Sequence, residues 1–215
     1  MSRRVLRKID PALDLRSFLF ELESMPEETF SIESFFGRAA PFEIEVGSGK
    51  GLFMQTVAER RPDHDFLGIE MARKYARYSA ARLARHDLTN GKMICGDGLR
   101  FFRERLPVSC AEAVHIYFPD PWWKKRHRKR RVMTPDFVSD IQRVLQPDGV
   151  LHFWTDVHEY FESTLEIIAD QPGLVGPEVV SEKSADHDLD YRTHFERRMR
   201  LNNEPVYRSR FRKSS

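Results

Sequence analysis

From Pro41 onward the chain alternates between short apolar runs and longer segments of helical periodicity, and this alternation constrains the fold more than any other feature. The apolar runs predict strands over residues 42–46, 65–70, 92–95, 113–118, 150–154, 175–181 and 206–211. The segments between them predict helices over residues 52–60, 72–85, 99–105, 135–145 and 157–169. Repeated β–α units give parallel strands joined by crossover helices. The sequence therefore predicts an α/β fold, with a doubly wound, mostly parallel sheet of seven strands and helices on both faces.

The first forty residues do not follow this alternation. They are predicted to form an N-terminal extension over residues 1–40, ahead of one domain over residues 41–215. Apolar residues from Leu15 to Leu22 recur at helical spacing, which predicts a short amphipathic helix over residues 11–23. The apolar side chains available to cover the main domain are those of Phe30, Ile32, Phe35 and Phe36.

Composition excludes several classes of protein. Hydrophobic residues make up 40% of the 215 residues and aromatic residues 12%, which is typical of a globular chain with a buried core. No apolar run approaches the roughly 18 residues of a membrane-spanning helix. The two cysteines, Cys95 and Cys110, have no ligand-like spacing, so neither a disulfide scaffold nor a zinc site is expected. The cytoplasm is the expected compartment.

The net charge of +2 conceals a strong separation of charge along the sequence. Residues 1–8, 122–131 and 197–213 together hold 18 basic residues and one acidic residue. The other 180 residues hold 17 basic and 32 acidic residues. One basic run would be read as a solvated loop, but three runs in a small, otherwise acidic protein favour a polyanionic partner such as a nucleic acid.

The first predicted strand runs into a glycine-rich turn, Gly47-Ser48-Gly49-Lys50-Gly51. Glycines let the backbone turn tightly and approach a ligand at the start of a helix. The third glycine comes one residue too early for the dinucleotide fingerprint, and Lys50 is followed by glycine where a phosphate-binding P-loop needs Ser or Thr. Taken alone, the turn is equally compatible with a plain strand-to-helix connection.

Acidic residues follow three consecutive predicted strands. Glu45 precedes the glycine turn, where it would repel a pyrophosphate and attract a cation such as the sulfonium of S-adenosylmethionine. Glu70 lies 21 residues beyond Gly49, a spacing that suits hydrogen bonds to ribose hydroxyls. Asp97, between two glycines, could accept a hydrogen bond from an adenine amino group. Each acid alone could be an ordinary surface or turn residue, but together they indicate a nucleoside-containing cofactor.

The fourth predicted strand ends in Pro119-Asp120-Pro121, followed by two tryptophans and a run of seven basic residues that ends at Arg131. The prolines stiffen the backbone around one carboxylate. The tryptophans offer aromatic surface on which a base can stack, although one of them is expected to belong to the core. The cations can hold phosphates. The segment therefore predicts an RNA-binding loop beside the cofactor site.

These motifs together resemble those of the tRNA (guanine-N7-)-methyltransferases, the TrmB-like family within the class I S-adenosylmethionine-dependent methyltransferases. Residues 119–131 are similar to the bacterial form of the family's signature loop. The other matching motifs, in the same order as in the family, are residues 45–51, 68–70, 96–98, 154–156, 193–196 and 204–208. The resemblance runs from about residue 41 to the C-terminus, and residues 1–40 match nothing that we can name.

The resemblance implies a Rossmann-like methyltransferase sheet and methyl transfer from S-adenosylmethionine to N7 of a variable-loop guanine, position 46 of the tRNA. The implied catalytic residue is Asp120. The implied cofactor-binding residues are Glu45, Gly47, Gly49, Glu70, Asp97 and Asp120. The implied substrate-binding residues are Lys124, Asp156, Thr193, His194, Phe195 and Glu196. The implied RNA contacts are Arg126, His127, Arg128, Lys129, Arg130 and Arg131. No metal and no obligatory protein partner are implied, and we expect a monomer or homodimer.

Three other interpretations remain open at the level of sequence. A class I methyltransferase acting on ribosomal RNA, protein or a small molecule keeps the fold and the cofactor, although the basic loop disfavours a small molecule. A nicotinamide-dependent oxidoreductase is disfavoured by the early third glycine and by Glu45. A non-catalytic RNA-binding module is disfavoured by the complete set of acids at the predicted strand ends.

Overall fold

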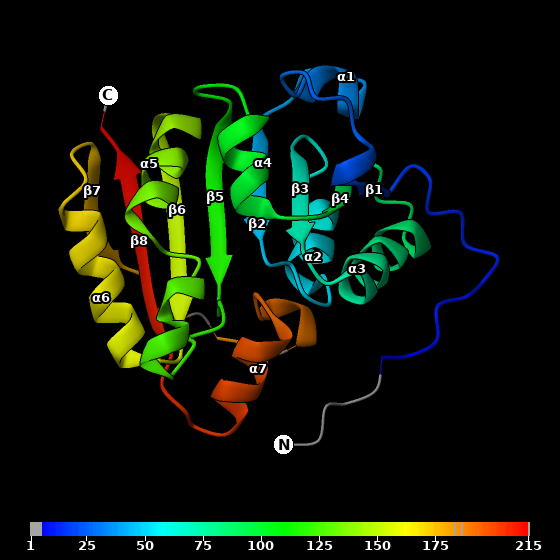
Figure 1. The fold of residues 1–215 in the computed structure, drawn as a ribbon. Coiled ribbons are helices and arrows are strands. Elements are labelled where there is room, and N and C mark those ends of the chain that lie inside the picture. Colours follow the sequence, from blue (N-terminus) through cyan, green and yellow to red (C-terminus); the bar gives the residue numbers. More distant parts are fainter. Residues whose placement is uncertain (1–5, 183, 186, 215) are drawn as a thin grey trace.

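An eight-stranded sheet organises the chain (Figure 1). The computed structural model describes residues 6–182, 184, 185 and 187–214, apart from the side chains of Lys125, Arg128 and Asp188. The strands are β1 (Leu19–Glu21), β2 (Phe42–Val46), β3 (Asp65–Glu70), β4 (Gly91–Cys95), β5 (Ala111–Tyr117), β6 (Leu145–Thr155), β7 (Leu174–Val179) and β8 (Tyr207–Lys213). The predicted α/β class is confirmed, and strand β1 raises the predicted count from seven to eight.

The strand order is β1-β4-β3-β2-β5-β6-β8-β7. The pairs from β1 to β6 are parallel, whereas β8 pairs antiparallel with both β6 and β7. Strand β2 lies between β3 and β5, so the strand order reverses at the β2–β5 pair. Ligands of doubly wound sheets bind beyond the carboxyl ends of the strands at such a switch point.

Helices cover both faces of the sheet (Figure 1). One face packs against α2 (Leu52–Arg60) and α3 (Arg73–Arg85) through a cluster that includes Phe53, Met54 and Leu83. The other face packs against α4 (Gly98–Glu104), α5 (Pro135–Val144) and α6 (His158–Ala169). The remaining helical segments are α1 (Ile32–Phe36), α7 (His194–Leu201), and the 3-10 segments Leu22–Ser24, Lys125–Arg130 and Asp188–Asp190.

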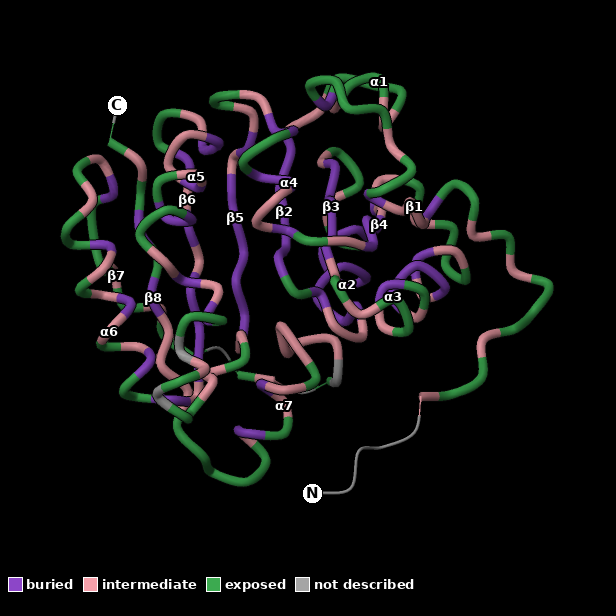
Figure 2. Tube along the Cα trace, in the orientation of Figure 1, coloured by how far each residue is buried: buried purple, intermediate pink, exposed green. Residues whose placement is uncertain are grey.

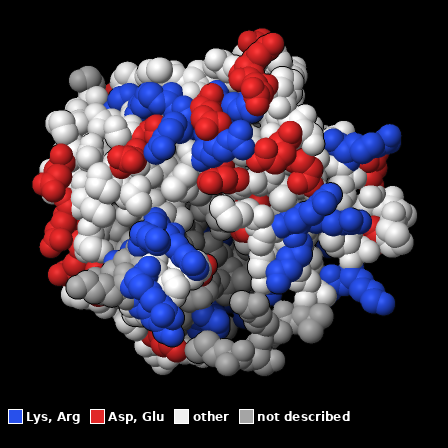
Figure 3. Space-filling model, viewed as in Figure 1, with Lys and Arg blue, Asp and Glu red and all other residues white. Residues whose placement is uncertain are grey.

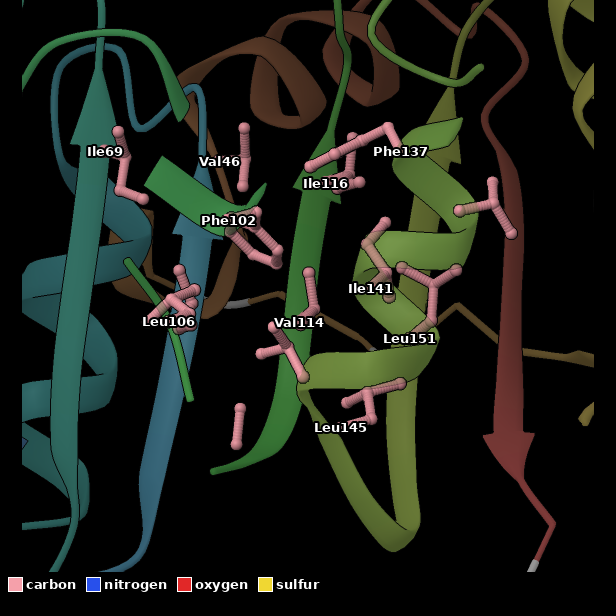
Figure 4. Packing of buried hydrophobic residues seen from close by; sticks show 14 of the residues in the cluster. Val46, Ile69, Phe102, Leu106, Val114, Ile116, Phe137, Ile141, Leu145 and Leu151 are labelled. Carbon is pink, nitrogen blue, oxygen red and sulfur yellow. The ribbon is translucent and has the colours of Figure 1, made fainter. Parts of the chain in front are cut away.

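The central strands are buried on both faces, as their nearly continuous apolar sequences require (Figure 2). Figure 4 shows Val114 and Ile116 of β5 facing Phe102 of α4 and Ile141 of α5, all four fully buried. This packing holds β2 and β5 rigidly side by side. The loops at their carboxyl ends therefore start from fixed points.

The helix predicted over residues 11–23 is wrong. Residues Leu19–Glu21 instead form strand β1, which pairs in parallel with β4, and Leu22–Ser24 form a 3-10 turn. A short window of four apolar residues suits either periodicity, and the unpaired backbone of β4 decides in favour of a strand. The N-terminal stretch thus completes the edge of the sheet. The division of the chain at residue 41 stays a prediction.

Among the described residues, no helix combines the length and the apolar character that crossing a membrane would require.

Leu22 tests how firmly the N-terminal stretch belongs to the core. Its side chain is buried and lies over Gly96, where an added Cβ would approach within 2.5 Å of Leu22. We expect Leu22→Ala to lower the free energy of unfolding by about 2–5 kcal/mol, measured by urea denaturation, because it leaves a cavity. The exposed Leu201 gives a matched control, Leu201→Ala, which should cost little. Equal effects of the two substitutions would contradict this packing.

Candidate active site

The glycine turn after β2 is held by the carboxylate of Glu70. One oxygen of Glu70 accepts a hydrogen bond from the Gly49 amide at 2.9 Å, and the other accepts from the Ala72 amide at 2.8 Å. Glu70 therefore ties the turn after β2 to the start of α3. Gly47 and Gly49 both have positive φ, and a Cβ on Gly47 would meet no atom within 4 Å. The turn thus presents bare backbone to open space.

Gly51, the third glycine, has a different role. Its φ is +69°, and a Cβ at this position would come within 2.7 Å of the Ser79 Cβ on α3. Its small size allows α2 and α3 to approach closely. The early third glycine, which argued against a dinucleotide fingerprint, is therefore required by helix packing.

Glu45 is buried at the end of β2, with 2% of its surface exposed. Its Oε2 atom has no hydrogen-bond partner among the described residues. Burial raises the pKa of Glu45 to about 8, and the nearby Glu70 carboxylate adds to the rise. A buried carboxyl group with one oxygen unsatisfied is costly in its charged form, so the site lacks one favourable interaction that a cation would supply.

Asp97 lies at the carboxyl end of β4 and caps helix α4. Its Oδ1 atom accepts a hydrogen bond from the Leu99 amide at 2.9 Å. The side chain is exposed. The predicted acids Glu45, Glu70 and Asp97 thus lie at the carboxyl ends of three adjacent strands, β2, β3 and β4.

The Pro-Asp-Pro loop leaves β5 with a strained backbone. Phe118 and Trp122, on either side of the prolines, have φ values of +50° and +45°. Such values cost energy in residues with side chains, and they cluster at functional sites. The Phe118 amide donates to the carbonyl of Trp154 at 2.8 Å, and its ring packs on Phe195 with centroids 4.8 Å apart. Asp120, between the strained residues, is exposed.

Arg131 anchors the far end of this loop. The side chain is buried, and its Nε donates to the Pro121 carbonyl at 2.8 Å. Its guanidinium also pairs with Glu159 of α6 at 2.7 Å and lies 4.5 Å from the centre of the Tyr160 ring. Arg131 therefore differs from the other basic residues of the run, because its donors hold the loop against the protein.

The remaining cations of the loop lie at the surface. Lys124, Arg126, Lys129 and Arg130 are exposed, as is Trp123, with 68% of its surface accessible. Trp122 is partly buried and lies under the Arg130 guanidinium at 5.0 Å. His127 accepts a hydrogen bond from Arg126 at 3.2 Å. The side chain of Arg128, another predicted RNA contact, lies outside the described residues.

Arg200, Arg208 and Arg210 of the third basic run are ion-paired with acids of the protein. Arg208 pairs with Glu182 and with the buried Glu196, at 2.9 and 3.2 Å. Arg200 pairs with the same two acids, and Arg210 pairs with Glu178. The pair of Arg208 with Glu196 joins β8 to α7, and the pair of Arg210 with Glu178 joins β8 to β7. Of the first run, the structure describes only residues 6–8.

The predicted substrate-binding segment 193–196 forms the start of α7, beyond the carboxyl ends of β3 and β5 (Figure 1). The Thr193 hydroxyl caps the helix by accepting from the Glu196 amide at 3.0 Å. His194 is exposed and accepts from Arg82 of α3 at 3.2 Å. Asp156, after β6, is half-buried, and burial raises the pKa of its carboxyl group. The structure thus brings these residues, like Asp120, beyond the carboxyl ends of the strands. The Glu196 carboxylate, however, is engaged in ion pairs.

A polar network between β2 and β5 was not predicted from the sequence. Glu43 and His115 approach within 2.7 Å, and the other ring nitrogen of His115 lies 2.9 Å from the Tyr117 hydroxyl. Arg61 closes the network through its ion pair with Glu43. The sequence did carry a signal for it, because His115 and Tyr117 are two residues apart in a strand and therefore lie on the same face of β5. The network fixes the end of β5, from which the Pro-Asp-Pro loop departs.

Comparison with known proteins shows which protein family this chain resembles. Residues 39–209 match a protein-family model described as "Putative methyltransferase". The chain belongs to this methyltransferase family. A relative from Rhodopirellula baltica named tRNA (guanine-N(7)-)-methyltransferase is 51% identical over 221 residues, covering 100% of this chain and 81% of the relative. One of the same name from Alcanivorax borkumensis is 37% identical over 169 residues, covering 77% and 70%.

Solved structures agree on the fold of this methyltransferase. A variant of the 16S rRNA (adenine(1408)-N(1))-methyltransferase from Catenulisporales acidiphilia, solved with its cosubstrate S-adenosylmethionine, superposes with a TM-score of 0.55. It is 16% identical, and the match covers 84% of this chain and 88% of that one. At this identity the likeness shows the fold alone. The expected Rossmann-like methyltransferase sheet is confirmed.

The buried carboxyl group of the methyltransferase predicts a pH-dependent stability. Because the pKa of Glu45 is about 8 in the folded chain and near 4.5 when exposed, the folded state holds an extra proton between these values. Stability contributed by the neutral form is therefore lost as the pH rises from about 4.5 to 8. We expect Glu45→Gln to raise the thermal midpoint of the ligand-free protein at pH 8 by more than at pH 5, measured by differential scanning calorimetry. The same difference at both pH values would contradict the raised pKa.

Proposed function

We propose that this protein transfers the methyl group of S-adenosylmethionine to N7 of a variable-loop guanine in tRNA. The observation that carries the proposal is the neighbouring position of two loops at the switch point of the sheet. The acid–glycine turn follows β2, the Pro-Asp-Pro basic loop follows β5, and these strands pair directly. The names of the relatives, tRNA (guanine-N(7)-)-methyltransferase, support the choice of substrate and atom.

The residues at the glycine turn fit S-adenosylmethionine. Bare backbone at Gly47 leaves room for a ligand, and the buried, unpartnered Oε2 of Glu45 suits a cation. Glu70 and Asp97 follow the next two strands, where carboxylates can accept hydrogen bonds from ribose and adenine. When bound, S-adenosylmethionine supplies an electrophilic methyl group on a sulfonium. The turn, Glu45, Glu70 and Asp97 would hold it.

The protein's part in the reaction is alignment and charge stabilisation. N7 of guanine has an in-plane lone pair, so no general base has to remove a proton before the transfer. Positive charge develops on the purine as the methyl group arrives. Asp120 is exposed beside the cofactor site, so its carboxylate can accept hydrogen bonds from N1 and N2 of guanine and offset that charge.

The exposed cations of the loop would bind the RNA backbone. Phosphate contacts position a nucleic acid without reading its sequence, and Lys124, Arg126, Lys129 and Arg130 all face solvent beside Asp120. Lys124 suits a phosphate or the guanine O6 atom, since a cation near N7 would oppose the charge of the product. Arg131 is assigned to holding the loop, because its donors are already engaged.

Residues at the start of α7 would complete the substrate site. Phe195 packs against Phe118 at the base of the loop, so it can position the strained backbone that carries Asp120. The proposal also includes Thr193, His194 and Asp156 as substrate contacts, and Glu196 as the anchor of α7. We propose that the protein acts in the cytoplasm on tRNA as a monomer or homodimer, without an obligatory protein partner.

Methyl transfer to bulk unmodified tRNA tests the function directly. We expect label from S-adenosylmethionine to appear in tRNA, and aniline treatment to cleave the product at one variable-loop guanine, because N7 methylation weakens the base's attachment. Label without such cleavage would retain the methyltransferase and refute the proposed target atom. No label in tRNA would refute the proposed substrate.

Asp120→Asn tests the catalytic role. The substitution keeps the shape of the side chain but removes the charge that offsets the purine cation. We expect kcat to fall by about 100-fold at saturating concentrations of both substrates. The control is Asp63→Asn, which should leave kcat unchanged. Asp63 is an exposed carboxylate that precedes β3, at the amino end of that strand and away from the proposed site. Full kcat in the Asp120 variant would exclude this role.

A further inference from the structure

Helix α3 carries five basic residues and no acidic residue, yet it was not part of the basic runs recognised in the sequence. Its buried face is made of small and apolar residues, including Ala76, Ala80 and Leu83. The cations Arg73, Lys74, Arg77 and Arg85 are all exposed. The helix is therefore amphipathic, and its outer surface is basic rather than a mixture of acidic and basic residues.

The stability of the helix accounts for the cations of its last turn, Arg82 and Arg85, but not for those nearer its start. Arg73 and Lys74 occupy the first turn, where the helix dipole favours acidic residues, and the N-cap Ala72 makes no side-chain hydrogen bond. Arg73 and Arg77 are like charges at i,i+4, which destabilises a helix. Arg73, Lys74 and Arg77 are thus kept at an electrostatic cost to their own helix, which points to an external anion.

Local acids leave much of this charge uncompensated. Arg73 pairs with Glu21 at 3.1 Å, and Arg82 donates to Gln55 and His194. Over the described part of the chain, Lys74, Arg77 and Arg85 form no ion pair. This contrasts with Arg200, Arg208 and Arg210 of the third basic run, which are all ion-paired.

The position of α3 places this charge beside the proposed active site. The helix begins at Arg73, three residues after Glu70, whose carboxylate holds the glycine turn. Arg82, further along α3, donates to His194 at the start of α7. Figure 3 shows Lys and Arg side chains over α3 and over the loop after β5, among other basic side chains on this face.

We infer that the outer face of α3 is a second RNA-binding surface, which holds the phosphate backbone of tRNA on the far side of the active site from the basic loop. The inference rests on the proposed function for the identity of the RNA. A helix of 13 residues is about 20 Å long, so its cations can contact a continuous stretch of backbone. Two positive surfaces on either side of Asp120 would orient the RNA across the site rather than merely attract it.

The double substitution Arg77→Gln with Arg85→Gln tests the surface. Glutamine keeps the helix propensity and length while removing two unpaired charges. We expect Kd for unmodified tRNA to rise about 10-fold or more at low salt, and the slope of log K against log salt to become shallower by about 1–2. Neither Kd for S-adenosylmethionine nor kcat at saturating tRNA should change.

Two comparison variants make the result specific. Arg126→Gln with Lys129→Gln removes two exposed cations of the loop and should give a similar change in Kd and slope. Arg100→Gln with Arg103→Gln removes the same charge from α4, where both cations are ion-paired with acids, and should change tRNA binding little. Circular dichroism and the thermal midpoint establish that each variant is folded.

The outcomes separate this inference from the proposed reaction. An α3 variant that binds tRNA like the wild type, or no worse than the α4 variant, overturns the inference while leaving methylation intact. Weaker, less salt-dependent binding by the α3 variant, in a protein that fails to methylate N7, supports the surface and refutes the reaction. Absence of tRNA binding by the wild type refutes both.

Discussion

The pairing of β2 with β5 is the interaction on which the rest of the site depends. These strands are distant in sequence, and their parallel pairing brings the end of each to the same edge of the sheet. Without it, the carboxyl group of Glu45 and the Pro-Asp-Pro loop would belong to separate surfaces. The packing of Val114 and Ile116 against the helices above holds that pairing in a rigid core.

Most basic residues that the structure describes fall into one of two groups: those that are ion-paired with a nearby acid and those that lie at the surface without such a pair. Arg200 of α7 and Arg208 of β8 meet Glu182 and Glu196, so these two cations stabilise the C-terminal part of the sheet. Those of the loop after β5 and of α3 stay largely at the surface. Arg131 stands between the two classes, since it belongs to the basic loop in sequence but to the interior in structure. Counting basic residues along the sequence therefore overstates the charge that the third run offers to a partner, and it does not reveal the basic surface of α3.

Sequence reasoning located the strands well because periodicity and glycine or proline boundaries are local properties. Strands β2 and β3 and helix α2 begin and end at the predicted residues. It failed at residues 11–23, where four apolar residues suit either periodicity and only the exposed edge of β4 decides between helix and strand. The acids at the strand ends were identified, but the burial of Glu45 and the pairing of Glu196 depend on contacts between remote segments.

Strand β8 is the last strand in sequence, yet it lies between β6 and β7. During synthesis, which proceeds from the N-terminus, β7 therefore emerges from the ribosome before it has any neighbour in the sheet. Arg208, on β8, also arrives after the Glu196 that it neutralises. The C-terminal side of the sheet, where the proposed substrate contacts lie, is thus assembled late, so a nascent chain can form its glycine turn long before it can complete the surface around Asp120.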